Sequence, residues 1–347
     1  MRQKQSDGII FWLVDPFSKH AELQRSAAMV IRSYTEHKIA QVIPIHFFSA
    51  YFTGEFPLSL PREWILEIKQ KAQEALNLIT HDLVIPGLKP LHVVARPYFS
   101  IRESIGYLNR LTQRLKNVEL VVTSTHGRRG LARFFLGSFA ETLLLHLRNT
   151  PTLLVNPAWK RNSDFKTILF PTDFSSESKA AFLRLLPLLK PFRSRVTLVH
   201  KIAFAWPPAL MITLDVAPAY EKTLEAEREM KRREAQIWIH EGRRRGIEVH
   251  SVMNSHTEDS VEESILDYAK GKHAILALAS QSGPLSTTLI GSTTRNLVRS
   301  SLDPVWVIPP LQEESQTQVR PETGETAAEV RREVLGITGE KPLKPAA

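Results

Sequence analysis

The residues with the clearest chemical potential form a glycine- and arginine-rich stretch, STHGRRGLARFFLGS, at positions 124–138. An apolar run, 118–123, comes directly before it, and an amphipathic segment, 139–147, follows. This order predicts a loop between a strand and a helix. The start of a helix presents unpaired N–H groups and a partial positive charge, which suit a phosphate. The stretch is therefore either a connecting loop or a loop that holds a phosphate.

The residue types in this stretch are those that phosphate binding would need. Gly127 and Gly137 would allow the backbone to approach a ligand closely, and Ser138 could donate a hydroxyl. Three arginines would add positive potential near the phosphates: Arg128, Arg129 and Arg133. The stretch is not a Walker A loop, because no Gly-Lys-Ser/Thr follows. It also lacks the Gly-x-Gly of a dinucleotide fingerprint.

A purely structural interpretation fits the same residues. Ser138-Phe139-Ala140-Glu141 has the pattern of a capping box, in which Ser138 only closes the start of a helix. Gly137 then supplies a turn conformation. Spacing alone leaves phosphate binding and a structural loop both open.

No constellation of catalytic residues accompanies the stretch. The sequence has no cysteine, which excludes disulfides and thiolate zinc sites. Where the site would lie, it shows no pair of carboxylates, no Ser-His-Asp spacing and no His-x-x-x-His. We interpret His126 as a neutral hydrogen-bonding residue, and His46 and His200, at strand ends, as structural. We therefore expect no catalytic residue and no resident metal.

The elements that must position these residues occur twice along the chain. Four landmarks recur in the same order, about 155 residues apart: Asp15 and Asp173, His46 and His200, Gly137 and Gly291, and Pro151 and Pro304. Such a constant offset indicates a tandem duplication. It predicts two domains, residues 1–158 and 166–310, which we call the first and the second repeat. Residues 159–165 form the predicted linker, and 311–347, with little apolar periodicity, a disordered tail.

Each repeat alternates apolar runs with helical patterns. The predicted strands are 8–14, 39–46, 91–96, 118–124 and 151–156, and then 166–172, 194–200, 247–253, 273–280 and 304–309. The predicted helices are 18–37, 61–80, 102–116 and 138–149, and then 176–190, 220–245, 258–271 and 292–301. Several strands are continuously apolar, as expected when helices cover both faces of a sheet. The fold class is therefore α/β, with open parallel sheets.

The composition is that of a soluble globular protein, with 43% hydrophobic and 23% charged residues. The formal charge of +9 would favour polyanionic partners, but the basic residues are spread over the predicted helices without interleaved aromatics. We therefore expect solvated helix faces and no specific nucleic-acid partner. The apolar run 8–14 is too short for a signal peptide, and no run approaches the roughly 20 apolar residues of a membrane span. We expect a cytoplasmic protein with no membrane contact.

The spacing of the glycine stretch resembles the signature loop of the universal stress protein family. In that family Gly-x-x-Gly, nine residues and then Gly-Ser/Thr wrap the triphosphate of ATP. Here Gly127, nine residues and Gly137-Ser138 match, while Ser124 replaces the first glycine. The resemblance extends over both repeats and includes the opening of the second, LFPTDFS at 169–175. It implies two five-stranded parallel sheets flanked by helices, and ATP as ligand, with any Mg²⁺ arriving bound to the nucleotide.

The resemblance also implies which residues hold the nucleotide. The family binds adenosine through the aspartate that ends the first strand and through the residue after the histidine of the second strand. These positions are Asp15 and Phe47 in the first repeat, and Asp173 and Lys201 in the second. With their neighbours and the loops, the predicted nucleotide-binding set is Val14, Asp15, Phe47, Ser124, Gly127, Arg128, Gly137, Ser138, Phe139, Thr172, Asp173, Lys201, Gly291, Ser292 and Thr293.

The departures from the family pattern differ between the repeats. In the first, Ser124 adds a Cβ beside the loop and Pro16 removes an N–H after Asp15. In the second, Leu278 and Gln281 replace both leading glycines. The first repeat thus keeps the better phosphate loop and the second the better adenosine end, which predicts one nucleotide site.

Three functions follow as hypotheses. The first is an ATP-binding module for stress response without efficient turnover. The second is an interaction scaffold with degenerate pockets that acts through an unidentified protein partner. The third, an ATP-consuming enzyme, lacks recognisable catalytic residues.

The resemblance implies a mode of assembly as well. In the family the fifth strand lies at a sheet edge and pairs with its counterpart in a partner subunit. Exposed apolar edges of this kind must be covered. Because two copies lie on one chain, we expect an intramolecular pseudo-dimer through 151–157 and 304–310, with a homodimer as the competing outcome.

Overall fold

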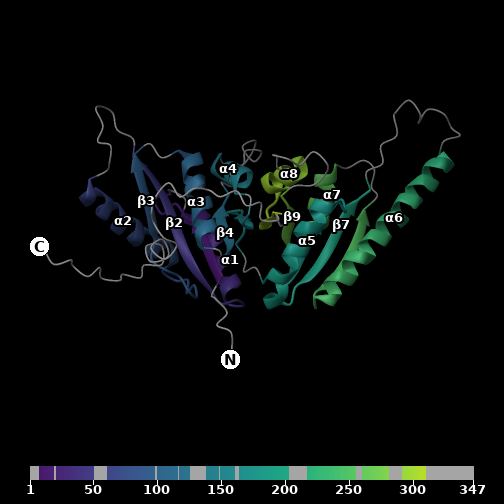
Figure 1. The fold of residues 1–347 in the computed structure, drawn as a ribbon, viewed down its shortest axis with the longest axis horizontal. Helices are drawn as coiled ribbons and strands as arrows, with labels where there is room; N and C mark the ends of the chain where they lie inside the picture. The colour runs from purple at the N-terminus through teal and green to yellow at the C-terminus, as the bar shows by residue number, and fades with distance from the viewer. Residues whose placement is uncertain are drawn as a thin grey trace, which may run out of the picture.

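The protein is an α/β protein in which the two repeats form matching halves (Figure 1). The computed structural model describes residues 8–18, 21–50, 61–97, 100–115, 117–125, 138–147, 149–160, 164–202, 217–254, 260–280 and 291–309. The predicted tail and residues 126–137 of the glycine stretch lie outside the described residues.

Strands and helices alternate in both repeats, as predicted. The first repeat contains β1 (Gly8–Leu13), α1 (Ala21–Thr35), β2 (Ala40–Ala50), α2 (Arg62–Thr80), β3 (His92–Pro97), α3 (Ile101–Leu115), β4 (Val118–Ser124), α4 (Ser138–His146) and β5 (Thr152–Val155). The second contains β6 (Thr167–Pro171), α5 (Ser176–Leu189), a short 3-10 helix η2 (Lys190–Phe192), β7 (Arg195–Lys201), α6 (Ala217–Arg244), β8 (Glu248–Asn254), α7 (Val261–Ala269), β9 (Ile275–Ala279), α8 (Ser292–Ser300) and β10 (Val305–Ile308). The largest difference is β2, which continues beyond the predicted end at 46 because Phe47 to Ala50 pair with β3.

The strands form one continuous ten-stranded sheet in the order β3-β2-β1-β4-β5-β10-β9-β6-β7-β8. The strands that pair within a repeat are parallel, whereas β5 and β10 pair antiparallel, with Trp306 opposite Leu153. The two five-stranded sheets expected from the sequence are thus halves of a single sheet. The predicted pairing of their edges occurs within one chain.

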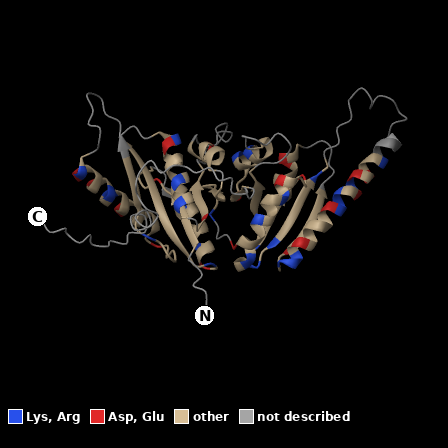
Figure 2. Cartoon of the chain, viewed as in Figure 1, with Lys and Arg blue, Asp and Glu red and all other residues tan. Residues whose placement is uncertain are grey.

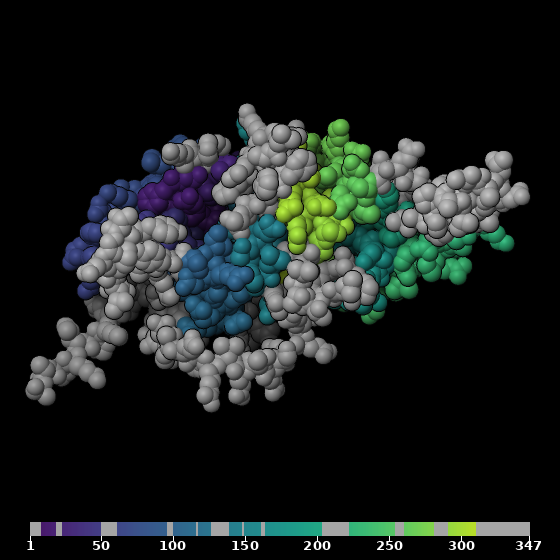
Figure 3. All heavy atoms as spheres, turned by 90° about the horizontal axis from the view of Figure 1, so that it is seen from above, coloured from purple at the N-terminus to yellow at the C-terminus, as the bar shows by residue number. Residues whose placement is uncertain are grey.

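Helices cover both faces of this sheet. On one face α1, α2, α5 and α6 pack against the strands through residues such as Ile31, Leu76, Phe182 and Trp238. On the other face α3 and α4 cover the first repeat and α7 and α8 the second. Figure 3 shows α4 and α8 side by side on this second face. Coverage of both faces explains why the central strands are continuously apolar.

The junction of the repeats is packed like a domain core. Tyr34 of α1, Phe165 and Trp306 of β10 are almost fully buried and form edge-to-face ring contacts with one another. On the other face, the carboxylate of Glu141 in α4 lies 3.1 Å from the guanidinium of Arg299 in α8. Asn156 donates a hydrogen bond of 2.9 Å to the carbonyl oxygen of Ser301. Side chains from both repeats therefore hold the junction on both faces.

The charged residues lie mainly on the outer surfaces of helices, and α6 carries a dense row of them (Figure 2). In the basic run 231–233 of α6, Lys231 pairs with Glu234 and Arg233 with Glu229 on the same helix. Such pairs at spacings of three and four residues are those of a solvated helix face. The structure thus agrees with the interpretation of these runs as helix surface.

The β5–β10 pairing predicts that the repeats are not independent. The first repeat expressed alone, as residues 1–160, exposes the apolar edge of β5, including Leu153 and Leu154, which are buried in the whole chain. We expect the isolated repeat to self-associate or precipitate, while the full chain remains monomeric. Sedimentation velocity over a range of concentrations measures this difference. An isolated repeat that stays monomeric and soluble would contradict the prediction.

Candidate functional site

The predicted adenosine positions lie where the strand order reverses. Along the chain, β1 is followed by β2 on one side of it, and β4 then pairs on its other side. The second repeat repeats this pattern, with β6 between β7 and β9. Ligands of open α/β sheets bind beyond the carboxyl ends of the strands at such points. Asp15 follows β1 and Asp173 follows β6, so each aspartate lies at this point of its repeat.

Asp173 is held in place by the first turn of α5. Its Oδ1 accepts hydrogen bonds from the backbone N–H of Ser175 at 3.0 Å, the hydroxyl of Ser175 at 2.7 Å and the hydroxyl of Ser178 at 2.6 Å. Ser175 also caps α5 by accepting from the N–H of Ser178. No other residue of the described part of the chain donates a hydrogen bond to Oδ2. The carboxylate is therefore fixed in orientation, with one oxygen open to a ligand.

The charge state of Asp173 follows from these contacts. Partial burial by itself would raise the pKa of the carboxyl group. The hydrogen bonds from Ser178 and Ser175 outweigh burial and hold the pKa of Asp173 below its usual range. The group is therefore an ionised acceptor at neutral pH.

His200 stabilises the strand end that carries Asp173. Its Nδ1 donates a hydrogen bond of 2.7 Å to the carbonyl oxygen of Thr172, and the ring is buried. A carbonyl oxygen can only accept, so the hydrogen lies on Nδ1. Burial lowers the pKa of His200, so the ring is neutral. The structural role predicted for this histidine is therefore confirmed.

Thr172 and Phe174 shape the turn after β6. The Thr172 hydroxyl accepts a hydrogen bond of 2.9 Å from the N–H of Phe174, which has a positive φ of 63°. The Phe174 ring lies against His200, with the ring centroids 5.2 Å apart. Because a positive φ is uncommon for a non-glycine residue, the bond to Thr172 and the ring contact with His200 hold Phe174 in this conformation. Sequence patterns gave no signal of this turn beyond the Thr-Asp-Phe-Ser motif.

The residues of the second repeat that are expected to contact the phosphates lie at the start of α8. Gly291 occupies the position before the helix and supplies no side-chain cap, while Ser292 is exposed and Thr293 half-exposed. The buried Thr294, which the sequence analysis did not select, donates its hydroxyl to the carbonyl oxygen of Ala279 at 3.0 Å. This bond ties the helix start to the end of β9. In the sequence, the only indication of this role is that Thr294 is the second hydroxyl-bearing residue after Ser292.

The first repeat has the same backbone arrangement around Asp15. His46 donates through Nδ1 to the carbonyl oxygen of Val14 at 3.1 Å, and burial lowers its pKa. Asp15 is exposed, with 58% of its side chain accessible. Its Oδ1 accepts from the N–H of Phe17 at 3.2 Å. The turn therefore forms despite Pro16, because the next N–H along the chain serves it.

Other predicted residues of the first repeat make contacts within the protein. Phe47 packs against the rings of Tyr107 and Phe139, at centroid distances of 6.1 and 6.4 Å. The hydroxyl of Ser124 donates to the carbonyl oxygen of Leu23 in α1. These side chains join strand ends to α1, α3 and α4.

Part of the predicted set lies beyond what the structure describes. Gly127, Arg128 and Gly137 are outside the described residues, and of Ser138 only its backbone position at the start of α4 is described. Glu141, the last residue of the predicted capping box, lies 3.1 Å from Arg299 and 3.8 Å from Arg295 of α8. This residue thus connects the helix after the glycine stretch to the second repeat.

Among the described residues there is neither a cluster of metal-binding side chains nor a helix able to span a membrane. No group of three histidine, aspartate or glutamate side chains comes together in a way that could hold a metal ion in the described part of the chain. No described helix combines the length and the apolar character that crossing a membrane requires.

Comparisons with known proteins address the fold and the family. A family model described as the universal stress protein family matches residues 27–156 and 164–309. A universal stress protein from Archaeoglobus fulgidus DSM 4304 is similar in structure, with a TM-score of 0.56 and 16% identity over 87% of this chain and 98% of that one. A functionally unknown protein from Pseudomonas aeruginosa PAO1 has a TM-score of 0.50 and 13% identity over 88% and 94%. A search of curated proteins found no match.

The buried His200 predicts a pH dependence of stability. The unfolded chain takes up a proton at this histidine near pH 6.5, whereas the folded protein resists it, so the free energy of unfolding falls as the pH drops through that range. We expect His200→Gln to lose roughly 1–3 kcal/mol at neutral pH with its hydrogen bond to Thr172, and to show a shallower decline towards pH ~5.

Urea denaturation of wild type and variant between neutral and mildly acidic pH measures both effects. His240→Gln, at an exposed position on α6, is the control and should leave both unchanged. Equal pH slopes in wild type and His200→Gln would contradict the assignment.

Proposed function

The chain belongs to the universal stress protein family, and on that basis we propose that this stress-response module binds an adenine nucleotide, ATP, beyond the carboxyl ends of its strands. Its action is binding without efficient turnover, and a bound nucleotide would regulate contact with a protein partner. The orientation of Asp173 is the observation that carries the proposal.

Asp173 has the properties of a ribose-binding carboxylate. Three hydrogen bonds to Oδ1 fix the group in advance, so binding a ligand orders no further side chain here. The lowered pKa keeps it ionised, and a hydroxyl that donates to an ionised acceptor makes a stronger bond than one to a neutral group. The open Oδ2 can accept from a ribose hydroxyl at the point where this fold class binds ligands.

Two further features bear on where the phosphates of the nucleotide would bind. The uncapped start of α8 leaves its first N–H groups available, and Ser292 is exposed beside them. In the first repeat the resemblance assigns the phosphates to the loop that contains Gly127 and Gly137. Because the contacts of Asp173 and of the start of α8 are described and those of residues 126–137 are not, we assign the proposed single site to the second repeat.

We do not expect the site to hydrolyse ATP efficiently. The histidine beside Asp173 is neutral, buried and bonded to Thr172 through Nδ1, so it is placed to support the strand end. Asp173 is already held by Ser175 and Ser178. At most a slow hydrolysis of bound ATP is expected.

One observation favours a second function for the first repeat, that of an interaction scaffold. Phe47 stands at the position that corresponds to Lys201, and its ring packs against Tyr107 and Phe139. Aromatic packing at this place serves the core and offers no polar group to a base. Under this alternative the second repeat binds nucleotide while the first serves assembly.

Equilibrium titration with fluorescently labelled ATP tests the proposal. We expect one site per chain and a loss of affinity of roughly 10- to 100-fold in Asp173→Asn, which keeps Oδ1 for α5 but replaces an ionised acceptor. The matched variant Asp15→Asn should bind as the wild type does. Absence of binding at millimolar nucleotide would remove the proposal, and loss in Asp15→Asn alone would move the site to the first repeat.

A further inference from the structure

The outer edge of β8 carries backbone groups that have no backbone partner within the described residues. β8 is the last strand of the sheet and pairs with β7 alone. The N–H of Arg195, the first residue of β7, donates a hydrogen bond of 2.7 Å to the residue before β6, so the next residue, Val196, faces β8. Because Val196 lies opposite Val249, it bonds to the two neighbours of Val249, and the N–H and C=O of Val249 point out of the sheet. Ser251 and Met253 follow the same alternation, and no backbone hydrogen bond among the described residues reaches this row.

A groove runs along this edge on the side of α6. Its volume is about 750 Å³, and it is lined by residues 246–251 and by Gln236, Ile239 and Arg243 of α6. The spacing of the three helix residues places them on one face of α6, which forms one wall. Ile239 is half-buried and Val249 is buried, so the middle of the groove is apolar. The groove therefore offers what one more strand would need: free backbone groups along one side and room for alternate side chains beside α6.

Arg243 makes one end of the groove positive. It is exposed and forms no ion pair with a carboxylate of the described residues. The next two arginines are paired, because Arg244 lies 3.6 Å and Arg245 2.8 Å from the carboxylate of Glu241. Since Glu241 already serves two guanidinium groups, Arg243 adds to an excess of positive charge at this end. Such an end favours an acidic partner.

The charges of β8 itself leave the α6 side of the edge open. The side chains of Glu248 and His250 alternate with that of Val249 and lie on the opposite face of the sheet from α6. There Glu248 is 3.1 Å from the guanidinium of Arg195 and accepts a hydrogen bond of 2.7 Å from Nε2 of His250. Charged side chains can protect an edge strand from pairing. These charges are balanced among themselves on the far face, so an acidic strand can approach from the α6 side.

We propose that the groove between α6 and the edge of β8 binds an extended acidic peptide of a partner protein. The peptide adds a strand to β8, and its backbone supplies hydrogen-bond partners to Val249, Ser251 and Met253. Its alternate side chains enter the groove against Ile239, and a carboxylate at its end contacts Arg243.

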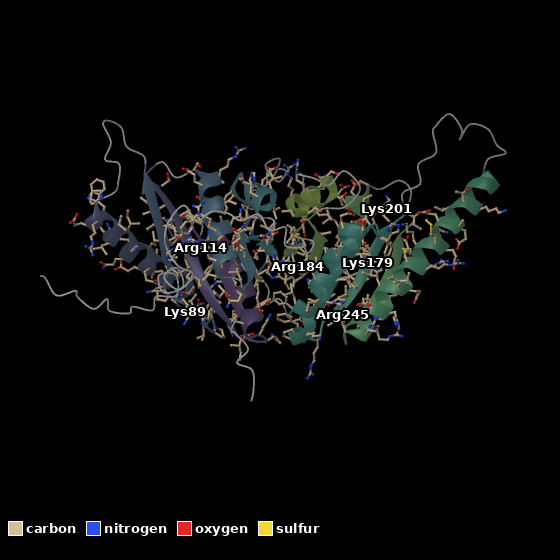
Figure 4. All side chains as sticks on the ribbon, in the orientation of Figure 1. Lys89, Arg114, Lys179, Arg184, Lys201 and Arg245 are labelled. Carbon is tan, nitrogen blue, oxygen red and sulfur yellow. The ribbon has the colours of Figure 1, made fainter. Side chains whose placement is uncertain are left out.

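This surface is separate from the proposed nucleotide site. Asp173 follows the carboxyl end of β6, whereas Arg243 lies in the last turn of α6, just before β8 begins. Figure 4 shows the same separation, with Lys201 at the upper, carboxyl end of β7 and Arg245 at the lower end of the second repeat. The proposal therefore stands whether or not the chain binds ATP.

A fluorescein-labelled peptide, Glu-Glu-Val-Thr-Val-Thr-Glu-Glu, tests the proposal on the full chain by fluorescence anisotropy. Its carboxylates at both ends serve either direction of pairing, and valine and threonine favour an extended strand. We expect saturable binding that weakens as NaCl increases, because salt screens the contact with Arg243. The charge-reversed peptide, Lys-Lys-Val-Thr-Val-Thr-Lys-Lys, should bind at least ~10-fold more weakly.

Two variants separate backbone pairing from charge. Ser251→Pro removes the outward N–H at an edge position where proline is tolerated, and it should abolish binding, whereas Ser251→Thr keeps the N–H and is the matched control. Arg243→Glu should weaken binding roughly 3- to 10-fold. Arg244→Glu, which changes the neighbouring residue outside the groove, should have a much smaller effect. Because Arg243 is exposed, its variant keeps the test decisive even if Ser251→Pro does not fold.

Three results would overturn the proposal: no binding of the acidic peptide by the wild type, equal affinity for both peptides, or undiminished binding by folded Ser251→Pro. Two further results would replace the partner by another occupant and so contradict it. A dimer of the full chain in sedimentation velocity that Ser251→Pro dissociates would assign the edge to a second copy. Displacement of the probe by a peptide of residues 311–347, at lower concentration than by the unlabelled probe, would assign it to the chain's own tail.

Discussion

The antiparallel pairing of β5 and β10 is the constraint on which the rest of the structure depends. Each repeat ends its sheet in a short strand, TLLV or VWVI, whose residues are all buried in the complete chain. Left alone, either edge would expose apolar side chains and unpaired N–H and C=O groups. Pairing turns two sheets of moderate size into one, and it lets apolar clusters continue across the junction on both faces. The duplication and the stability of the fold are therefore linked.

The two repeats keep the same backbone devices and differ in the side chains around them. In both, a buried histidine of the second strand donates through Nδ1 to the carbonyl oxygen that precedes the aspartate. Next to that histidine, the first repeat has a packed phenylalanine and the second an unpartnered lysine. A shared frame with different neighbours would permit one repeat to serve assembly and the other to bind a ligand, as the proposed function requires.

Much of the fold could be predicted because its signals are local and repeated. Continuous apolar runs marked the strands, and the landmarks shared by the repeats placed Asp173 and His200 at corresponding strand ends. The position of Asp173 followed from its motif, whereas its three hydrogen bonds depend on how α5 packs. The extension of β2 depends on pairing with β3, which no local pattern records. Lys201 was selected by position, but its burial without a partner is a property of the tertiary structure.

The junction also determines how the two candidate phosphate ends are placed. Helix α4 begins directly after the glycine stretch of the first repeat, and α8 begins after Gly291 of the second. Glu141 of α4 lies against Arg295 and Arg299 of α8, and both helices contribute to one apolar cluster. Since helices are stiff over two or three turns, contacts along their length restrict how their first turns are oriented. The same contacts that hold the repeats together therefore position the starts of both helices relative to each other.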